Sequence, residues 1–245
     1  MKQLIIELNH DGKPRLNVDR IFDSYKVLVL RGPRCCEMSC LPNNQLHQIY
    51  TEIAESIGEL VPMEECLQTG NKNGELWTDI QYNPSIENSY RHSNTRQPFH
   101  TDGSYESDAP NISCFYCMVA AKQGGATTFL DYDELLDCLD TKLRDRLEST
   151  PVLFSKGNDS KTRPIIHDGR LTWNYFRASS PEDPTLVEDF HRFLEDRIVE
   201  SHIAVDIYLQ SGDAVFFQDE LLLHGRNAFF GNRWLKKGGL RWIKN

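Results

Sequence analysis

The stretch Pro98-Phe-His-Thr-Asp-Gly-Ser-Tyr105 decides how the rest of the chain is interpreted. Side chains two residues apart on an extended segment point to the same face, so the imidazole of His100 and the carboxylate of Asp102 are expected side by side. Together they offer two neighbouring ligands for a divalent first-row metal. A second imidazole from a distant strand would complete the two-histidine, one-carboxylate set, which is typical of non-haem Fe(II) oxygenases.

His224 is the candidate for that second imidazole. It ends the apolar run Leu221-Leu-Leu, which predicts a core strand, and Gly225-Arg226 breaks the pattern after it. Taken alone, a histidine in this position is more often structural, with its ring bonded to a backbone carbonyl. The residues that follow decide between the two interpretations.

Two cations follow His224 on a short extended stretch. Arg233 and Lys237 lie at even spacing in Gly231-Asn-Arg-Trp-Leu-Lys-Lys237, so both are expected on the side from which His224 projects. A metal-chelating dicarboxylate such as 2-oxoglutarate needs a cation for its distal carboxylate, best a guanidinium with a hydroxyl beside it. Thr127 or Thr128, after the Gly-Gly turn at 124–125, can supply that hydroxyl.

The order of these motifs resembles that of the taurine/2-oxoglutarate dioxygenase (TauD/TfdA-like) family, over residues 98 to 238. The Arg-Trp-Leu ending at 233–235 is similar to that of the clavaminate synthase-like branch. The resemblance implies a mainly β domain with flanking helices around a double-stranded β-helix (a jelly roll, cupin-like). It also implies the following site: Fe(II) on His100, Asp102 and His224, and 2-oxoglutarate on Thr127 and Arg233.

The function implied by the resemblance is oxidation, foremost hydroxylation, of an unactivated C–H bond with O2, releasing succinate and CO2. Halogenating relatives of this chemistry carry a small residue at the carboxylate position, so Asp102 favours oxygenation. The expected substrate is a small carboxylated or amino-acid-like molecule of specialised metabolism, free or carrier-tethered. Its predicted contacts are Lys237 (where the family usually has Arg), Arg241 four residues on, Ser104 and Tyr105.

Two other classes of function are compatible with parts of this pattern. A metal-binding jelly roll that serves as a sensor or scaffold without oxygenase turnover would not need Thr127 and Arg233 together. A metal-dependent hydrolase or isomerase on a cupin-like barrel would be active with Zn(II) or Mn(II) and without oxygen.

Composition and charge limit the binding partners and the cellular location that are expected for this protein. A net charge of -9 over 245 residues argues against nucleic acid, and the absence of any apolar run near 18 residues argues against a membrane span. The apolar run at 4–6 is too short for a signal peptide, so a cytoplasmic protein with reduced cysteines is expected. Cys114 and Cys117 are spaced to face opposite sides of a strand, which argues against a redox or zinc pair.

The chain is expected to form one domain over 1–245, and residues 62–97 are predicted to be a lid or substrate-binding loop within it. Its pocket candidates are Trp77, Tyr82, Asn88 and Tyr90, whereas His92 and His167 are expected to be structural. Apolar periodicity predicts helices at 43–60, 131–147 and 184–201, the last with Pro184 at its first position. Strands are predicted at 3–7, 26–31, 112–120, 151–154, 163–167, 171–176, 203–209, 214–218, 221–224 and 233–243, with a hairpin turn at 212–213.

Overall fold

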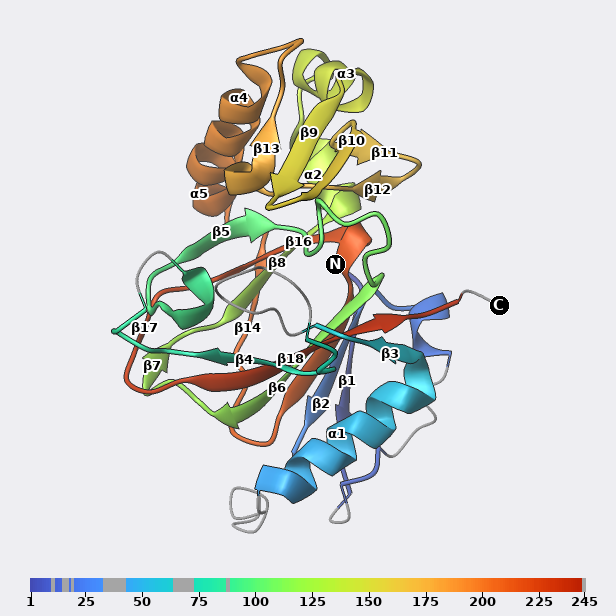
Figure 1. Ribbon diagram of the computed structural model, residues 1–245, viewed down its shortest axis with the longest axis vertical. Helices are drawn as coiled ribbons and strands as arrows, with labels where there is room; N and C mark the ends of the chain where they lie inside the picture. Colours follow the sequence, from blue (N-terminus) through green and yellow to red (C-terminus); the bar gives the residue numbers. More distant parts are fainter. Residues whose placement is uncertain are drawn as a thin grey trace.

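Two β-sheets face each other in a jelly roll, as the sequence predicts (Figure 1). The computed structural model describes residues 1–9, 12–14, 18, 20–32, 43–63, 73–86 and 89–243. The large sheet has the order β1 (Gln3–Glu7), β2 (Val27–Arg31), β15 (Ala214–Gln218), β6 (Ile112–Val119), β18 (Trp234–Arg241) and β3 (Glu59–Val61), and β4 (Thr78–Gln81) also pairs with β18. The small sheet has the order β14 (Val205–Ile207), β8 (Thr127–Asp131), β16 (Leu222–Arg226) and β5 (Gln97–His100).

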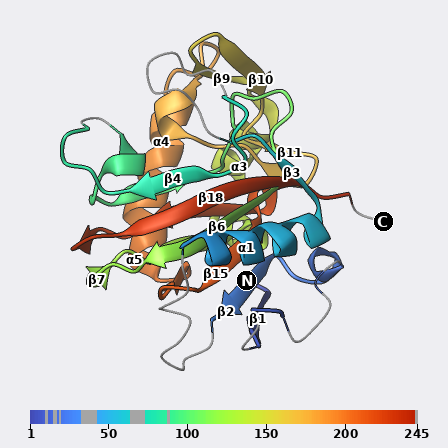
Figure 2. The ribbon, with the colours of Figure 1, turned by 60° about the horizontal axis from the view of Figure 1, so that its bottom comes forward.

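The large sheet is buried on both faces, and the side chains of β2 alternate between the two buried layers. Val27 and Val29 point into the apolar layer between the two sheets. Leu28 and Leu30 point the other way, into a core covered by helix α1 (Asn43–Ile57), which lies along the sheet (Figure 2). The helix is three residues shorter than predicted, because the chain turns at Gly58 and enters β3.

The outer face of the small sheet is covered by the upper part of the molecule in Figure 1. Leu223 of β16 and Phe99 of β5 pack there against Trp173 and Phe190. The covering elements are α2 (Tyr132–Cys138), α3 (Thr141–Ser149), β9 (Val152–Lys156), β10 (Asp159–Arg163), β11 (Ile166–His167), β12 (Arg170–Leu171), η4 (Tyr175–Arg177), β13 (Ala178–Ser179), α4 (Leu186–Arg192), the π-helical η5 (Phe193–Ile198) and α5 (Val199–Ser201). Every helix of the described residues is too short or too polar to cross a membrane.

Capping residues correct two predicted helices. The helix expected over 131–147 is two helices, because Asp140 accepts the N–H of Leu143 at 2.8 Å and starts α3 as an N-cap. Asp131 caps α2 in the same way through Asp133. The helical run expected from Pro184 begins at Leu186 instead, so Pro184 precedes the N-cap residue.

Two strand predictions and one turn prediction were also wrong in part. The strand expected at 171–176 ends at Leu171, and Tyr175–Arg177 forms the 3-10 helix η4. Residues 163–167 are divided between β10 and β11. Gly212 and Asp213 do form a turn, but β14 and β15 belong to different sheets, so the turn carries the chain across the jelly roll rather than closing a hairpin.

Residues 62–97 are more regular than predicted where they are described. Thr78 to Gln81 form β4, and Tyr90–His92 form the 3-10 helix η3. Trp77 lies in the core with its ring 5.0 Å from that of Tyr116, so its assignment to the pocket was wrong. Asn88 lies outside the described residues, and Tyr90 borders the main cavity.

Candidate active site

The two histidines of the motif lie opposite each other on neighbouring strands. His100 ends β5 and is paired in register with His224 of β16, and their ring centroids are 4.2 Å apart. The carbonyl of Pro98 lies 3.0 Å from Nδ1 of His100, which assigns the proton to Nδ1 and the lone pair to Nε2. The side-chain amide of Gln97 donates to that Nε2 at 3.1 Å. Antiparallel pairing therefore delivers the two imidazoles to one place, although they are distant in the sequence.

Asp102 joins them from a turn rather than from the strand, so the alternation argument for its position was wrong. Strand β5 ends at His100, and the backbone N–H of Asp102 is held by Asp219 Oδ2 at 2.8 Å. Ser113 on β6 donates to Oδ2 of Asp102, also at 2.8 Å. One ligand atom from each of His100, Asp102 and His224 lies within 4.8 Å of the others. Donor atoms bound to one ion at about 2 Å lie about 3 to 4 Å from one another. A small inward movement of these three side chains would therefore bring their donor atoms to metal-binding distances.

The protonation states of the three groups suit a metal. Burial lowers the pKa of His100 to about 3 and that of His224 to about 4, so both rings are neutral near pH 7. Burial alone would raise the pKa of Asp102, but the Lys237 ammonium and the two imidazoles hold it below its ordinary value. Two neutral nitrogens and one carboxylate are a donor set that fits a first-row divalent ion.

Asp219 is a functional candidate that the sequence analysis missed. It is buried, and its Oδ1 lies 3.3 Å from Nδ1 of His224. Neither atom has a hydrogen-bond partner among the described residues. An Nδ1–H directed at this carboxyl group would leave Nε2 of His224 free for a metal. The only signal in the sequence was the polar triplet Gln218-Asp219-Glu220 between two apolar runs, with Asp219 five positions before His224.

Replacing Asp219 with asparagine is expected to weaken divalent-metal binding by about 10- to 100-fold. Burial raises the pKa of Asp219, but its carboxyl group still presents two oxygens, one to the Asp102 N–H and one to His224 Nδ1, whereas the amide presents only one. Competition with a metallochromic indicator measures the change. Asp133→Asn is the matched control, since Asp133 is exposed and pairs with Lys26. Equal metal affinity in the two variants would contradict the role of Asp219.

The three groups open into a cavity of about 810 Å³. Arg233 and Thr127 border it, and both are buried. Arg233 makes no ion pair with any described residue, and burial lowers its pKa to about 10. A buried unpaired guanidinium is costly unless an anion completes it, so the pair fits a carboxylate ligand.

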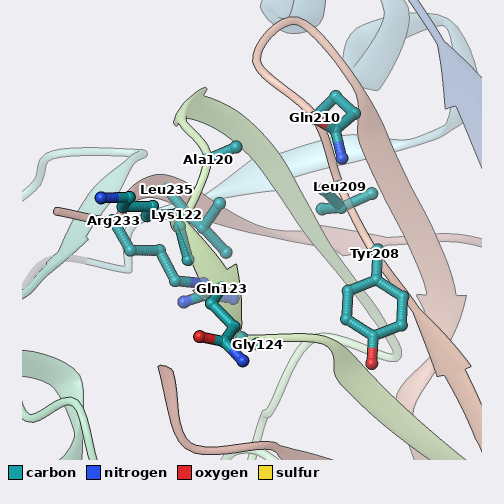
Figure 3. A pocket seen from close by; sticks show the side chains of 11 residues that line it. Ala120, Lys122, Gln123, Gly124, Tyr208, Leu209, Gln210, Arg233 and Leu235 are labelled. Carbon is teal, nitrogen blue, oxygen red and sulfur yellow. The ribbon is translucent and has the colours of Figure 1, made fainter. Parts of the chain in front are cut away.

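The backbone at Gly125 shapes the position of Arg233. A Cβ at Gly125 would lie 3.2 Å from both Cδ and Nε of Arg233, and the φ of Gly125 is +75°. Gly125 also borders a second cavity of about 150 Å³, together with Arg233, Lys122 and Tyr208, and these last three are labelled in Figure 3. The glycine therefore lets the chain pass closely against the guanidinium side chain.

The predicted substrate contacts separate into two groups. Lys237 and Tyr105 border the main cavity; Lys237 Nζ lies 2.5 Å from Oδ1 of Asp102, and Tyr105 accepts from Lys156. Ser104 is buried away from it, and Arg241 pairs with Asp108 outside it, so neither residue borders the cavity. Four residues carry Arg241 roughly 13 Å along β18 from Lys237, past the end of the cavity.

Comparison with known proteins places this geometry in a family. The sequence model described as "Taurine catabolism dioxygenase TauD, TfdA family" matches residues 7–238. The chain belongs to the TauD/TfdA family. This confirms the family that the motifs indicate.

Proteins and solved structures that are similar to this chain extend the comparison. The 3-((Z)-2-isocyanoethenyl)-1H-indole synthase of Fischerella ambigua (strain UTEX 1903) is 26% identical over 63% of this chain and 65% of its own length. The uridine-5'-phosphate dioxygenase of a Streptomyces species is 26% identical over 56% of this chain and 57% of its own. The chain thus spans about two-thirds or less of these curated relatives.

Two solved structures share the fold. An asparagine oxygenase in complex with Fe(II), 2S,3S-3-hydroxyasparagine and succinate has a TM-score of 0.73 at 17% identity, over 88% of this chain and 74% of that one. The PvcB protein of Pseudomonas aeruginosa has a TM-score of 0.64 at 19% identity, over 98% of this chain and 86% of that one. At these identities the likeness establishes the jelly-roll fold of the chain.

Proposed function

We propose that this protein is a non-haem Fe(II)- and 2-oxoglutarate-dependent dioxygenase of one domain. The observation that carries the proposal is the convergence of His100, Asp102 and His224 in one cavity with the buried Arg233, which has no ion-pair partner in the described part of the chain. A metal-binding scaffold without turnover has no need for that guanidinium beside the ligand set. The asparagine oxygenase structure, which contains Fe(II) and succinate, supports the same assignment.

The residues have distinct roles in this proposal. Nε2 of His100, Nε2 of His224 and one oxygen of Asp102 hold Fe(II), and Arg233 with Thr127 holds the distal carboxylate of 2-oxoglutarate. With O2, the bound iron and cosubstrate supply the oxidation of a substrate C–H bond and yield succinate and CO2. Ser113 and Asp219 fix the rotation of the Asp102 carboxylate and its backbone. Because Asp102 fills the carboxylate position, oxygenation rather than halogenation is the expected outcome.

The substrate is a small carboxylated or amino-acid-like molecule whose acid group reaches Lys237. The Lys237 ammonium faces the metal site and borders the cavity. It favours a free acid over a carrier-tethered thioester, because the thioester lacks the carboxylate. Residues 73–97 supply part of the wall through Thr78, Ile80 and Tyr90, which supports a substrate-binding role for the 62–97 segment.

An anaerobic titration tests the proposal. Addition of 2-oxoglutarate to the Fe(II)-loaded protein is expected to produce a weak visible charge-transfer band, and O2 with substrate is expected to produce succinate. The Zn(II)-loaded protein should produce none. A protein that turns over with Zn(II) without oxygen, or that binds Fe(II) but never 2-oxoglutarate, would contradict the assignment.

Lys237→Met is expected to raise the KM for substrate by about 10- to 100-fold, since a charge-assisted hydrogen bond to the acid group is lost. The affinity for 2-oxoglutarate should change little. Arg241→Met is the matched control and should leave both constants near those of the wild type, because Arg241 lies outside the cavity. If Arg241→Met raised the KM and Lys237→Met did not, Arg241 rather than Lys237 would bind the acid group of the substrate.

A further inference from the structure

Three aromatic rings form a wall of the main cavity that the proposed chemistry does not use. Tyr90 comes from η3, and Tyr175 and Phe176 come from η4. The ring of Phe176 lies 5.4 Å from that of Tyr90 and 5.2 Å, edge-on, from that of Tyr175. Phe176 is nonetheless 56% exposed. A large apolar ring left open inside a ligand-sized cavity is a common sign of a binding surface.

This aromatic wall, Tyr90, Tyr175 and Phe176, is held by its surroundings. Tyr175 stacks on His191 at 3.7 Å between centroids, and its hydroxyl donates to Glu188 at 3.0 Å. The carbonyl of Tyr90 accepts from Arg226 at 3.0 Å. Rings fixed in this way lose little conformational entropy when a ligand packs on them, so they bind well.

The wall is within reach of the metal site. Arg226, which holds Tyr90, lies two residues after His224 on β16, a rise of roughly 7 Å. A molecule with its acid group at Lys237 can therefore extend past the histidines to the rings. Both ends border the same cavity.

A positive charge beside the aromatic wall also favours an aromatic ligand. Arg177 follows Phe176 directly, is exposed, and borders the cavity. Among the described residues it has no ion-pair partner. A guanidinium beside an aromatic surface attracts the electron-rich face of a ring. The chain as a whole has a net charge of -9, so a cation at each end of the cavity is a local feature.

We propose that the substrate is an acid that carries a planar aromatic ring, with the acid group at Lys237 and the ring packed against Tyr90 and Phe176. This inference rests on the proposed function and names the substrate class for the same site. It separates this protein from oxygenases whose amino-acid substrates have short polar side chains.

The test compares ring acids with aliphatic acids on the Fe(II)- and 2-oxoglutarate-loaded enzyme. Tryptophan, phenylalanine and cinnamate are the ring acids, and leucine, asparagine and 2-hexenoate are their counterparts. Binding is read from the change in the visible charge-transfer band, and coupling from substrate-dependent succinate. At least one ring acid is expected to bind about tenfold more tightly than its counterpart. Phe176→Ala should remove that preference.

One control variant and the wild-type charge-transfer band keep the outcomes separate. Phe230→Ala removes another exposed phenylalanine, on β17 (Phe229–Phe230) outside the cavity, and should leave the preference intact. A wild-type band with no ring preference, or a preference that survives Phe176→Ala, overturns this inference alone. Absence of the band in the wild type overturns the proposed function, and this inference with it.

Discussion

Replacing His224 with alanine is expected to abolish stoichiometric Fe(II) binding and to lower O2-dependent succinate formation by at least about a thousandfold. The change removes one of three candidate ligands, and the remaining imidazole and carboxylate form an incomplete set. Metal content after gel filtration measures the first effect, and a succinate assay with O2 measures the second. The charge-transfer band with 2-oxoglutarate is a third readout. The band should be absent in the variant at any accessible concentration of Fe(II).

The fold must be shown to survive the substitution. The ring of His224 is buried and lies 4.9 Å from that of Phe217, so the alanine leaves a cavity in the layer between the sheets. His224→Gln fills more of that space, lacks the imidazole ligand and should show the same loss with a smaller change in Tm. His167→Gln is the control, because His167 lies outside the main cavity and bonds Thr172. A charge-transfer band in His224→Gln equal to that of the wild type would remove His224 from the metal site.

The motif pair His100 and His224 could be predicted from the sequence, but the reason they meet could not. Their positions depend on the register of β5 against β16, which is a long-range pairing. The sequence identifies which residue types can bind a metal. It does not show which of the many acidic residues folds behind a ligand, which is why Asp219 and Ser113 were missed.

The same limit explains the errors in the fold. Apolar runs and alternation located β1, β2, β6 and β15, because the burial of each strand face determines which residue types occur along that stretch of sequence. The sheet to which a strand belongs is a tertiary property, so Gly212-Asp213 was taken for a hairpin turn although it links two sheets. Arg241 lies on the same strand as Lys237. No local sequence pattern shows how far the cavity extends along that strand, so the position of Arg241 outside the cavity could not be predicted.

Loss of the Arg233 guanidinium is expected to weaken the binding of 2-oxoglutarate by about 30- to 1000-fold in Arg233→Met, with Fe(II) affinity nearly unchanged. The cation is buried and lacks an ion-pair partner among the described residues, so the distal carboxylate is the anion that completes it. Arg233→Lys should recover part of the affinity, because the charge returns without the two-pronged geometry. Anaerobic titration of the charge-transfer band measures all three proteins.

Two further variants test whether position matters as well as charge. Gly125→Ala keeps every cation, but its Cβ would lie 3.2 Å from Cδ and Nε of Arg233 and must displace them. Its affinity for 2-oxoglutarate should fall between those of the wild type and Arg233→Met. Lys122→Gln removes a cation beside the smaller cavity that Arg233 also borders, and it should bind normally. If Lys122→Gln lost affinity for 2-oxoglutarate and Arg233→Met did not, the cosubstrate carboxylate would lie in that smaller cavity. The proposed iron site would then be retained, but Arg233 would not be the residue that binds the distal carboxylate.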